Sequence, residues 1–480
     1  MNLWDGMKVK NTILNSKGSE YYETSYDANL DLFAKISRFN EEYKILDTFC
    51  DAYEENSSLA LSNLLYILDI RDGKGERRIF KIIYSYLCNN HPDDALKILP
   101  LISKLGRYDY ILVGIDTPIE SNVISLIKEQ LEYDLKTDNP SLLAKWLPSH
   151  RSHNTNNELA KKLIKLLGMS EKEYRVTLST IRSKLNIVEK NLTNRDYENI
   201  DFNKVPSKAM LKYNKAYTTN MSDMYNHYKE SLNNGESEIK TTGLFSYEIV
   251  KRILFNKDSD NIYDYMWKNQ KEIFDFNPDN ILVVADTSGS MTNYNYIPYC
   301  TSIGLAIYIS ERNKGIYKNK FITFSEKPVL QEIKGDTISE KIKSMKTINA
   351  YNTDIDKVFK IIIDSALENN ISNEELPSHI IIISDMEFDS GVASQSGTNF
   401  SGWKQLFESH GYKLPNIIFW NVACDSKGLP VTMFDNDVAL ISGFSTSILE
   451  SILSLDKYNP VDVMLEKLKY YTHLLNKVYD

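Results

Sequence analysis

Residues 281–291 read ILVVADTSGSM, an aliphatic run that stops at Asp286 and continues into three hydroxyl residues around a glycine. A short, wholly apolar and β-branched run predicts a strand that is buried on both faces. An acid at the carboxyl end of such a strand has three possible roles: a nucleophile, a metal ligand, or the first residue of a turn. Each role gives the chain a different function.

The same pattern repeats through the second half of the chain. Five short apolar runs are predicted strands: ILVVAD (281–286), KFITFS (320–325), HIIIISD (379–385), NIIFWNVAC (416–424) and VALIS (438–442). Helical patterns lie between them, and this alternation predicts a doubly wound α/β sheet. Ligands of such sheets bind outside the carboxyl ends of the strands. Two of the runs end in an aspartate at that edge, Asp286 and Asp385.

The first half has a different period. Apolar residues recur at helical spacing from about residue 27 to 266, as in 59–70 and 77–90, and short breaks such as HPDD separate the segments. Successive amphipathic helices of this length are typical of helix pairs stacked in a solenoid. We therefore predict two domains, a helical one over 20–275 and an α/β one over 276–480.

Composition narrows the class of protein. The chain of 480 residues is 42% hydrophobic and 25% charged, as expected of a globular protein. It contains no apolar stretch of the length that spans a bilayer, and its start has no secretory signal. The four cysteines form no CxxC pair, so we expect neither a disulfide framework nor a zinc site, and a reducing cytoplasm is the predicted compartment.

The formal net charge of −9 is unevenly distributed. Residues 141–220 hold 15 Lys and Arg against 7 Asp and Glu, which is +8 and leaves −17 for the rest of the chain. A basic surface of this kind can bind a polyanion whatever the sign of the whole protein.

The residues around Asp286 separate its possible roles. An aspartyl-phosphate phosphatase of the haloacid dehalogenase type needs a second acid two residues further on, and Ser288 stands there. Alternating Asp and Ser oxygens along a turn suit a hard cation such as Mg²⁺. A hydroxyl-rich turn that caps a helix is the structural alternative.

Two further segments complete a known pattern. A Thr-Asp pair (NTDID, 352–356) precedes a predicted helix, and HIIIISD (379–385) ends in Ser-Asp. With DTSGS (286–290) they resemble the metal-ion-dependent adhesion site of von Willebrand factor A domains. That resemblance implies a Mg²⁺ or other divalent-cation site with one position open to an acidic ligand. By position its residues are Asp286, Ser288, Ser290, Thr353 and Asp385.

The helical half also carries recognisable stretches in a fixed order. They are GKGER (73–77), GRYD (106–109), KWLPS (145–149), EYR (173–175) and VPS (205–207). Followed by the DTSGS domain, this order resembles the TROVE module of the Ro ribonucleoprotein family. The resemblance implies a non-enzymatic RNA-binding protein whose helices form a solenoid or ring of HEAT-like repeats, with single-stranded ends of small or misfolded RNA as partners. We also expect a monomer that is not bound to a membrane.

Candidate RNA contacts are cations of the helical half, because cations follow phosphates while aromatic side chains stack on unpaired bases. The candidates are Lys74, Arg77, Arg78, Lys145, His150, Arg151, Lys161, Lys162, Arg175, Arg182, Lys208 and Lys212. Tyr174, Tyr213 and Tyr217 are possible stacking residues, and Trp146 is expected in the core. For each cation the alternative is a solvated helix face, and for each aromatic a packing contact.

A second function belongs to another class. The chain could be a protein–protein scaffold whose metal site binds an acidic residue of a partner protein. A hydrolase has little support, since the sequence shows no HExxH motif and no Walker loop.

Overall fold

The computed structural model of the chain describes most of its 480 residues. The described ranges are 12–14, 18, 20–150, 156–256, 260–272, 280–314, 316–323, 328–345, 354–388, 399–423, 428–453, 455 and 459–479.

A six-stranded sheet forms the centre of the second half, as the apolar runs predict. Its strands are β3 (Ile281–Ala285), β4 (Lys320–Thr323), β5 (Leu330–Glu332), β6 (His379–Ser384), β7 (Asn416–Asn421) and β8 (Val438–Ser442). Their spatial order is β5-β4-β3-β6-β7-β8, and only β5 is antiparallel to its neighbour. Such an order is that of a doubly wound sheet, and it changes direction between β3 and β6. Every residue of β3 is buried, which explains why the strand has no polar face.

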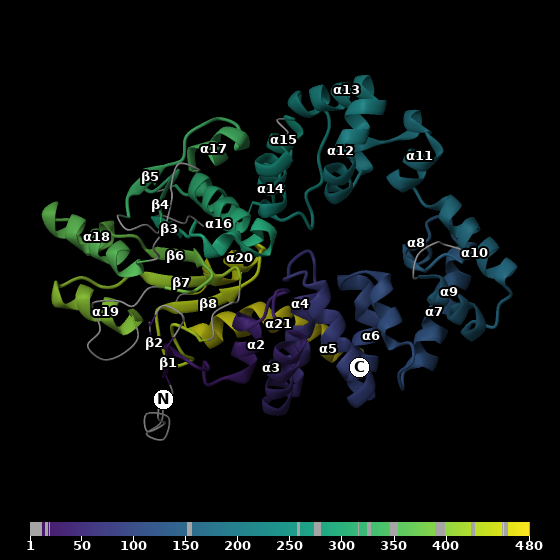
Figure 1. Cartoon of the computed structure of the whole chain (residues 1–480), viewed down its shortest axis with the longest axis horizontal. Coiled ribbons are helices and arrows are strands. Elements are labelled where there is room, and N and C mark those ends of the chain that lie inside the picture. The colour runs from purple at the N-terminus through teal and green to yellow at the C-terminus, as the bar shows by residue number, and fades with distance from the viewer. Residues whose placement is uncertain are drawn as a thin grey trace.

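Helices cover this sheet (Figure 1). They are α16 (Asn293–Arg312), α17 (Ile338–Met345), α18 (Ile355–Glu368), α19 (Asn399–Ser409) and α20 (Ile448–Leu453). The longest of them, α16, packs against β3, β4 and β6. On α19, the Trp403 ring stacks on Phe359 of α18 with ring centroids 4.1 Å apart.

The helical half is a succession of helix pairs. Its α-helices are α2 (Ala28–Lys35), α3 (Glu42–Glu55), α4 (Ser57–Leu68), α5 (Arg77–Asn90), α6 (Pro92–Leu105), α7 (Glu120–Lys136), α8 (Leu143–Trp146), α9 (Asn156–Leu166), α10 (Glu171–Lys184), α11 (Val188–Asn194), α12 (Ser207–Asn220), α13 (Ser222–Asn233), α14 (Ser246–Asn256) and α15 (Ile262–Lys268). A helical half followed by an α/β part with a mixed sheet confirms the predicted fold class at this level.

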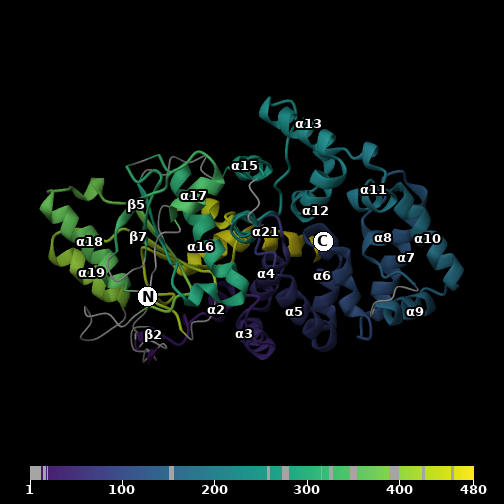
Figure 2. The same ribbon diagram turned by 45° about the horizontal axis from the view of Figure 1, so that its top comes forward.

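The helices follow an arc that leaves the α/β part and returns to it (Figures 1 and 2). At the end of the arc, α14 packs along α16. Just before α14, the Phe245 ring lies close to Gly75, in the turn between α4 and α5, so the end of the arc meets its first helices. The Arg38 guanidinium also donates to the Tyr247 hydroxyl at 3.2 Å, which joins the start of the arc to α14. The arc therefore closes into a ring, which consists of α2–α15 and the α/β part.

Both ends of the described chain cross to the opposite half. A short hairpin, β1 (Thr12–Leu14) and β2 (Glu20–Tyr22), lies on the α/β part, where Tyr22 pairs with Leu429. The last helix, α21 (Pro460–Tyr479), runs from the sheet onto α4, α2 and α6 (Figure 1). On it, the Tyr471 hydroxyl donates to Asp69 at 3.1 Å. The two halves are therefore interlocked.

None of the helices among the described residues is long and apolar enough to cross a membrane.

Candidate functional site

Two buried aspartates meet at the carboxyl edge of the sheet. Asp286 directly follows β3 and Asp385 directly follows β6, and these strands are parallel neighbours with Ala285 opposite Ile383. The edge between them is the point at which the strand order reverses, where doubly wound folds bind their ligands. The fold thus brings together two carboxylates that lie about a hundred residues apart in the sequence.

Serine side chains surround the first carboxylate. Asp286 accepts the Ser288 backbone N–H on Oδ1 and the Ser384 hydroxyl on Oδ2, each at 2.8 Å. The Ser288 and Ser290 hydroxyl oxygens lie 3.1 Å apart. We call Asp286, Ser288, Ser290 and Asp385 the cradle, because their oxygens form one cluster in the described structure.

The cradle is strongly acidic for a buried site. Asp286 is 0% exposed and Asp385 is 1% exposed. Burial, together with the nearby Asp385 carboxyl, raises the pKa of Asp286 to about 6. Among the described residues no Lys or Arg forms an ion pair with either carboxylate. Two adjacent buried carboxyls without a cationic side chain are an arrangement that a bound cation would stabilise.

The donor set also suits a hard divalent cation. It consists of carboxylate and hydroxyl oxygens, the ligands that Mg²⁺ prefers. The neighbouring Thr287 hydroxyl is buried and has no hydrogen-bond partner among the described residues. A group of three or more His, Cys, Asp or Glu side chains that could hold a metal ion does not occur in the part of the chain that the structure describes. A cation would therefore depend on serine hydroxyls here.

The remaining residue of the predicted metal site, Thr353, lies outside the described residues. The next residue, Asp354, is the N-cap of α18 and accepts the Lys357 backbone N–H at 3.2 Å. Its carboxylate also pairs with the Lys357 ammonium group at 3.1 Å. The acid of the Thr-Asp pair thus serves as a helix cap.

The helical half packs over the same edge of the sheet. The Tyr21 hydroxyl donates to the Met386 carbonyl at 2.8 Å, next to Asp385. Further along the edge, the Ser37 hydroxyl donates to the Ala423 carbonyl at 2.9 Å. These contacts place the cradle at the junction between the two halves of the molecule.

A second candidate site lies in the helical half. A pocket of about 580 Å³ is formed by residues from α5, α8, α11, α12 and the connecting segments. We call it the basic pocket, after its six cationic residues: Arg77, Arg107, Lys145, Lys204, Lys208 and Lys212. Two aromatic side chains, Trp146 and Tyr213, line it as well. It has the size and the residue types to take one or two unpaired nucleotides.

Acidic side chains offset part of this charge. Arg107 pairs with Asp109 at 2.6 Å, and Lys145 pairs with Glu189 at 3.1 Å. Lys204 and Lys208 are also paired, with Asp201 and Glu248 respectively. The six cations and these four acids leave a net charge of +2 at the pocket. The pocket is therefore moderately basic, not a strong polyanion site.

The aromatic residues of the pocket carry cations on their faces. The Arg107 guanidinium lies 3.7 Å from the centre of the Trp146 ring, and the Lys212 ammonium lies 4.7 Å from the centre of Tyr213. The prediction that Trp146 belongs to the core is wrong, because the side chain is only half-buried and lines the pocket. Tyr174 and Tyr217, in contrast, are 0% exposed and belong to the core.

Four of the twelve predicted RNA contacts line the basic pocket, namely Arg77, Lys145, Lys208 and Lys212. Sequence reasoning missed Arg107 and Lys204. Arg107 lies within GRYD (106–109), and Lys204 directly precedes VPS (205–207), so the place of both cations at these stretches is the signal that could have found them.

Two predicted contacts have structural roles instead. Lys74 is 1% exposed, and its ammonium group donates to the Phe33 carbonyl and to the Ser442 hydroxyl. Its place among the RNA contacts is therefore a wrong prediction. The Arg182 guanidinium donates to the Ala144 and Leu147 carbonyls at 2.7 and 2.9 Å, and so fixes the turn after α8.

The other predicted contacts lie outside the pocket. Arg78 donates to the Asn40 carbonyl at 2.5 Å, and His150 lies 3.4 Å from Glu171. Lys161 and Lys162 pair with Glu158 and Asp116. Arg175 is exposed on α10. Arg151 lies outside the described residues.

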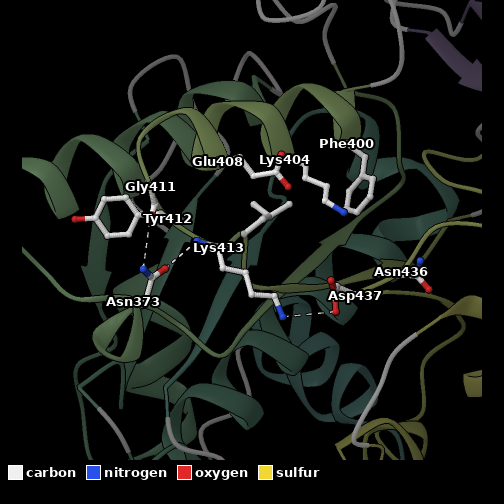
Figure 3. Close-up of a pocket in the computed structure, with 10 residues that line it drawn as sticks. Asn373, Phe400, Lys404, Glu408, Gly411, Tyr412, Lys413, Asn436 and Asp437 are labelled. Atoms are coloured by element: carbon white, nitrogen blue, oxygen red, sulfur yellow. Dashed lines mark hydrogen bonds and ion pairs between the residues drawn. The ribbon is translucent and has the colours of Figure 1, made fainter.

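A third cavity, of about 490 Å³, lies in the α/β part (Figure 3). Lys413 and Asp437 face each other across it at 3.8 Å; Lys413 lies three residues before β7, and Asp437 directly before β8. Lys404 and Glu408 of α19 line the opposite wall (Figure 3). The cavity is thus at the amino edge of the sheet, the end opposite to the cradle. Doubly wound folds bind ligands at the carboxyl edge, so this cavity is the weaker candidate.

These features define a class of protein: a helical ring closed by a doubly wound α/β part, with an acidic cradle at the junction. Family models match both halves. Residues 280–470 match the Domain of unknown function DUF7788. Residues 16–106 and 124–276, just over half of the chain, match the Domain of unknown function DUF2828. The chain belongs to the DUF2828 family.

Individual proteins are similar to the chain as well. The Uncharacterized protein L728 of Acanthamoeba polyphaga mimivirus is 28% identical over 517 residues, which cover 98% of this chain and 89% of the viral protein. Among solved structures, the Ro (RSR) protein of Deinococcus radiodurans is similar over 89% of this chain and 91% of its own, with 13% identity and a TM-score of 0.38. A likeness at that TM-score supports no conclusion about function.

Proposed function

We propose that the protein binds single-stranded RNA in the basic pocket, without catalysing a reaction on it, and holds a divalent cation in the cradle. The observation that carries the RNA proposal is the pocket itself. Its cations come from segments far apart in the sequence, Arg77 and Lys212 among them, and they converge beside Trp146 and Tyr213. Cations and aromatic faces in one groove are the usual means of binding unpaired nucleotides.

The ordered motifs support the same proposal. The stretches that resemble the TROVE module of Ro proteins include GRYD (106–109), KWLPS (145–149) and VPS (205–207). Each of them contributes residues to the pocket: Arg107, Lys145 and Trp146, and Val205 and Pro206. The resemblance and the pocket therefore converge on the same surface.

The cation in the cradle would be held by Asp286, Ser288 and Ser290, with Asp385 beside them. When bound, it would supply a fixed positive charge between two buried carboxylates. The side chains of the chain itself hold these ligands in place: Ser384 donates to Asp286, and the Glu387 backbone N–H donates to Asp385 at 3.1 Å. In this proposal the ion organises the junction of the two halves.

Fluorescence anisotropy with a labelled single-stranded 12-mer RNA, titrated at several salt concentrations, tests the RNA proposal. Lys212→Glu and Trp146→Ala should each weaken binding about tenfold, since a stacked base contributes roughly 1–3 kcal/mol. Lys161→Glu is the matched control, because Lys161 lies on α9 outside the pocket. It should change the affinity less than twofold.

The salt dependence separates specific from general attraction. Each phosphate contact adds about −0.7 to the slope of log K against log[salt] for a single strand, so the two or three phosphates that flank the nucleotides in the pocket give a slope of roughly −1.4 to −2. Equal losses in Lys212→Glu and Lys161→Glu would contradict the proposal. Capture of an acidic protein partner that depends on Asp286, with no RNA in the purified material, would favour the protein scaffold instead.

A further inference from the structure

The segment directly after the cradle has an unusual backbone. Tyr294, Asn295 and Tyr296 have φ angles of 53°, 59° and 62°, so three successive residues other than glycine are left-handed. Each such residue costs roughly 1–2 kcal/mol relative to the right-handed form. A conformation of this kind persists only where its surroundings hold it. We call these three residues the left-handed turn.

Both ends of the helical arc hold this turn. The Tyr294 ring stacks on Phe39, with centroids 4.1 Å apart and an angle of 13° between the rings. Phe39 follows α2, at the start of the arc. The Tyr296 ring lies 4.8 Å from that of Phe255, and Phe255 is on α14, at the end of the arc.

A hydrogen bond adds to the grip on α14. The Lys251 ammonium group donates to the Asn295 carbonyl at 2.7 Å. One turn of three residues thus contacts α14 through both its backbone and a ring. In Figure 1, α14 and the start of α16 lie side by side at the place where the arc returns.

Short-range hydrogen bonds connect the left-handed turn to the cradle. The Met291 N–H donates to the Ser288 carbonyl at 3.2 Å, and the Thr292 N–H and hydroxyl donate to the Gly289 carbonyl at 3.1 and 2.7 Å. These bonds lead into a short 3-10 helix, η4 (Ser290–Thr292), which ends two residues before Tyr294. A change in the position of Ser288 or Ser290 would therefore be passed to the turn.

We propose that the left-handed turn is a clasp that links cation binding in the cradle to closure of the helical ring. A cation held by Ser288 and Ser290 fixes the 3-10 segment and the turn, so α14 is held on α16 more firmly with the ion than without it. The linkage is reciprocal, so opening the ring weakens cation binding by the same factor. This inference rests on the proposed cation site.

Hydrogen exchange of the full chain, with Mg²⁺ or with a chelator, tests the linkage. In the wild type, Mg²⁺ should slow exchange of the α14 amides (246–256) at least fivefold. Asp286→Ala should remove this response. Tyr294→Ala with Tyr296→Ala should still bind Mg²⁺ but should leave α14 exchange insensitive to it. Tyr133→Ala, at an exposed position on α7, is the control and should behave as the wild type.

Calorimetric titration with Mg²⁺, done in parallel with hydrogen exchange, separates the clasp from the cation site. If Mg²⁺ binds but α14 exchange stays constant, the clasp is refuted and the cation site stands. If Mg²⁺ does not bind, both fall. Should the double tyrosine variant fail to fold, Lys251→Met removes only the bond to Asn295. It should reduce the Mg²⁺ response of α14 at least twofold, and an unchanged response would overturn the clasp.

Discussion

Asp286 and Asp385 share one edge of the sheet because β3 and β6 are parallel neighbours. Asp286→Ala should abolish the stabilisation of the protein by Mg²⁺, since it removes a carboxylate of the proposed site. In the wild type, Mg²⁺ at a hundred times its dissociation constant should raise the free energy of unfolding by about 2.7 kcal/mol. Thermal unfolding with and without a chelator measures the difference.

RNA binding is the control for this variant. The cradle and the basic pocket share no residue, so Asp286→Ala should change RNA affinity less than threefold. A stabilisation by Mg²⁺ that survives in the variant would place the cation elsewhere in the molecule.

His379 gives a prediction for pH dependence. Burial at the start of β6 lowers the pKa of its imidazole to about 4, whereas the unfolded chain has an ordinary value near 6.5. The folded state thus favours the neutral ring, and its contribution to stability is complete above pH 6.5. It is lost as the pH falls from 6.5 to 4, because the unfolded chain then binds a proton that the folded chain does not.

The size of this effect follows from the shift. One pKa unit corresponds to 1.36 kcal/mol, so up to about 3 kcal/mol of stability should be lost over that range. Urea unfolding of wild type and His379→Gln at pH 7 and pH 4.5 measures the contribution of the ring. Parallel pH profiles for the two proteins would show that the imidazole is not the cause.

At the level of elements, the contact between α14 and α16 depends on Gly304. A Cβ atom at this position would lie 3.0 Å from the Ser246 hydroxyl and 3.2 Å from its carbonyl carbon. Alanine favours a helix over glycine by about 1 kcal/mol, but overpacking costs roughly 1–3 kcal/mol. Gly304→Ala should therefore destabilise the protein by about 1 kcal/mol in urea unfolding.

A second substitution checks the cause. Adding Ser246→Gly to Gly304→Ala removes the side-chain atoms that the new methyl group meets, so part of the loss should be recovered. A Gly304→Ala protein as stable as the wild type would mean that the two helices can separate freely at this point.

The elements of the fold differ in how far the sequence predicts them. Strands such as β3 and β6 can be predicted from the sequence because burial on both faces leaves only apolar residues in them. The acids and serines at their ends predict the cradle. The sequence does not show which surface α21 packs against. An amphipathic pattern shows that a helix has an apolar face but not which surface covers it. For the same reason the sequence predicts a separate α/β domain to residue 480, whereas α21 packs on the helical half.

The side-chain roles show the same limit. Lys74 in GKGER (73–77) has the composition of an anion site, but the fold buries it under Phe33 and Ser442 from two distant segments. The left-handed turn is likewise invisible, because Tyr-Asn-Tyr has no glycine to mark a positive φ. In both cases the conformation depends on contacts between segments hundreds of residues apart, Lys74 with Ser442 and Tyr294 with Phe39.

At the level of the whole molecule, the two halves should unfold together. The hairpin residue Tyr22 pairs with Leu429 of the α/β part, and Tyr471 of α21 bonds to Asp69 of the helical half. Neither half can unfold without exposing surface of the other. Differential scanning calorimetry of the full chain should therefore show one transition, with equal calorimetric and van't Hoff enthalpies. Two resolved transitions would contradict this interlocking.

The crossing of the chain ends also has a consequence during synthesis. The Tyr21 hydroxyl finds its acceptor at Met386, 365 residues later in the chain. At about 5–20 residues per second, the ribosome needs roughly 20–70 s to make that stretch. Tyr21 therefore stays without this acceptor while the chain in between is made, and the nascent helices meanwhile keep apolar surface uncovered. Production of this protein should depend on chaperones far more than the length of either half suggests.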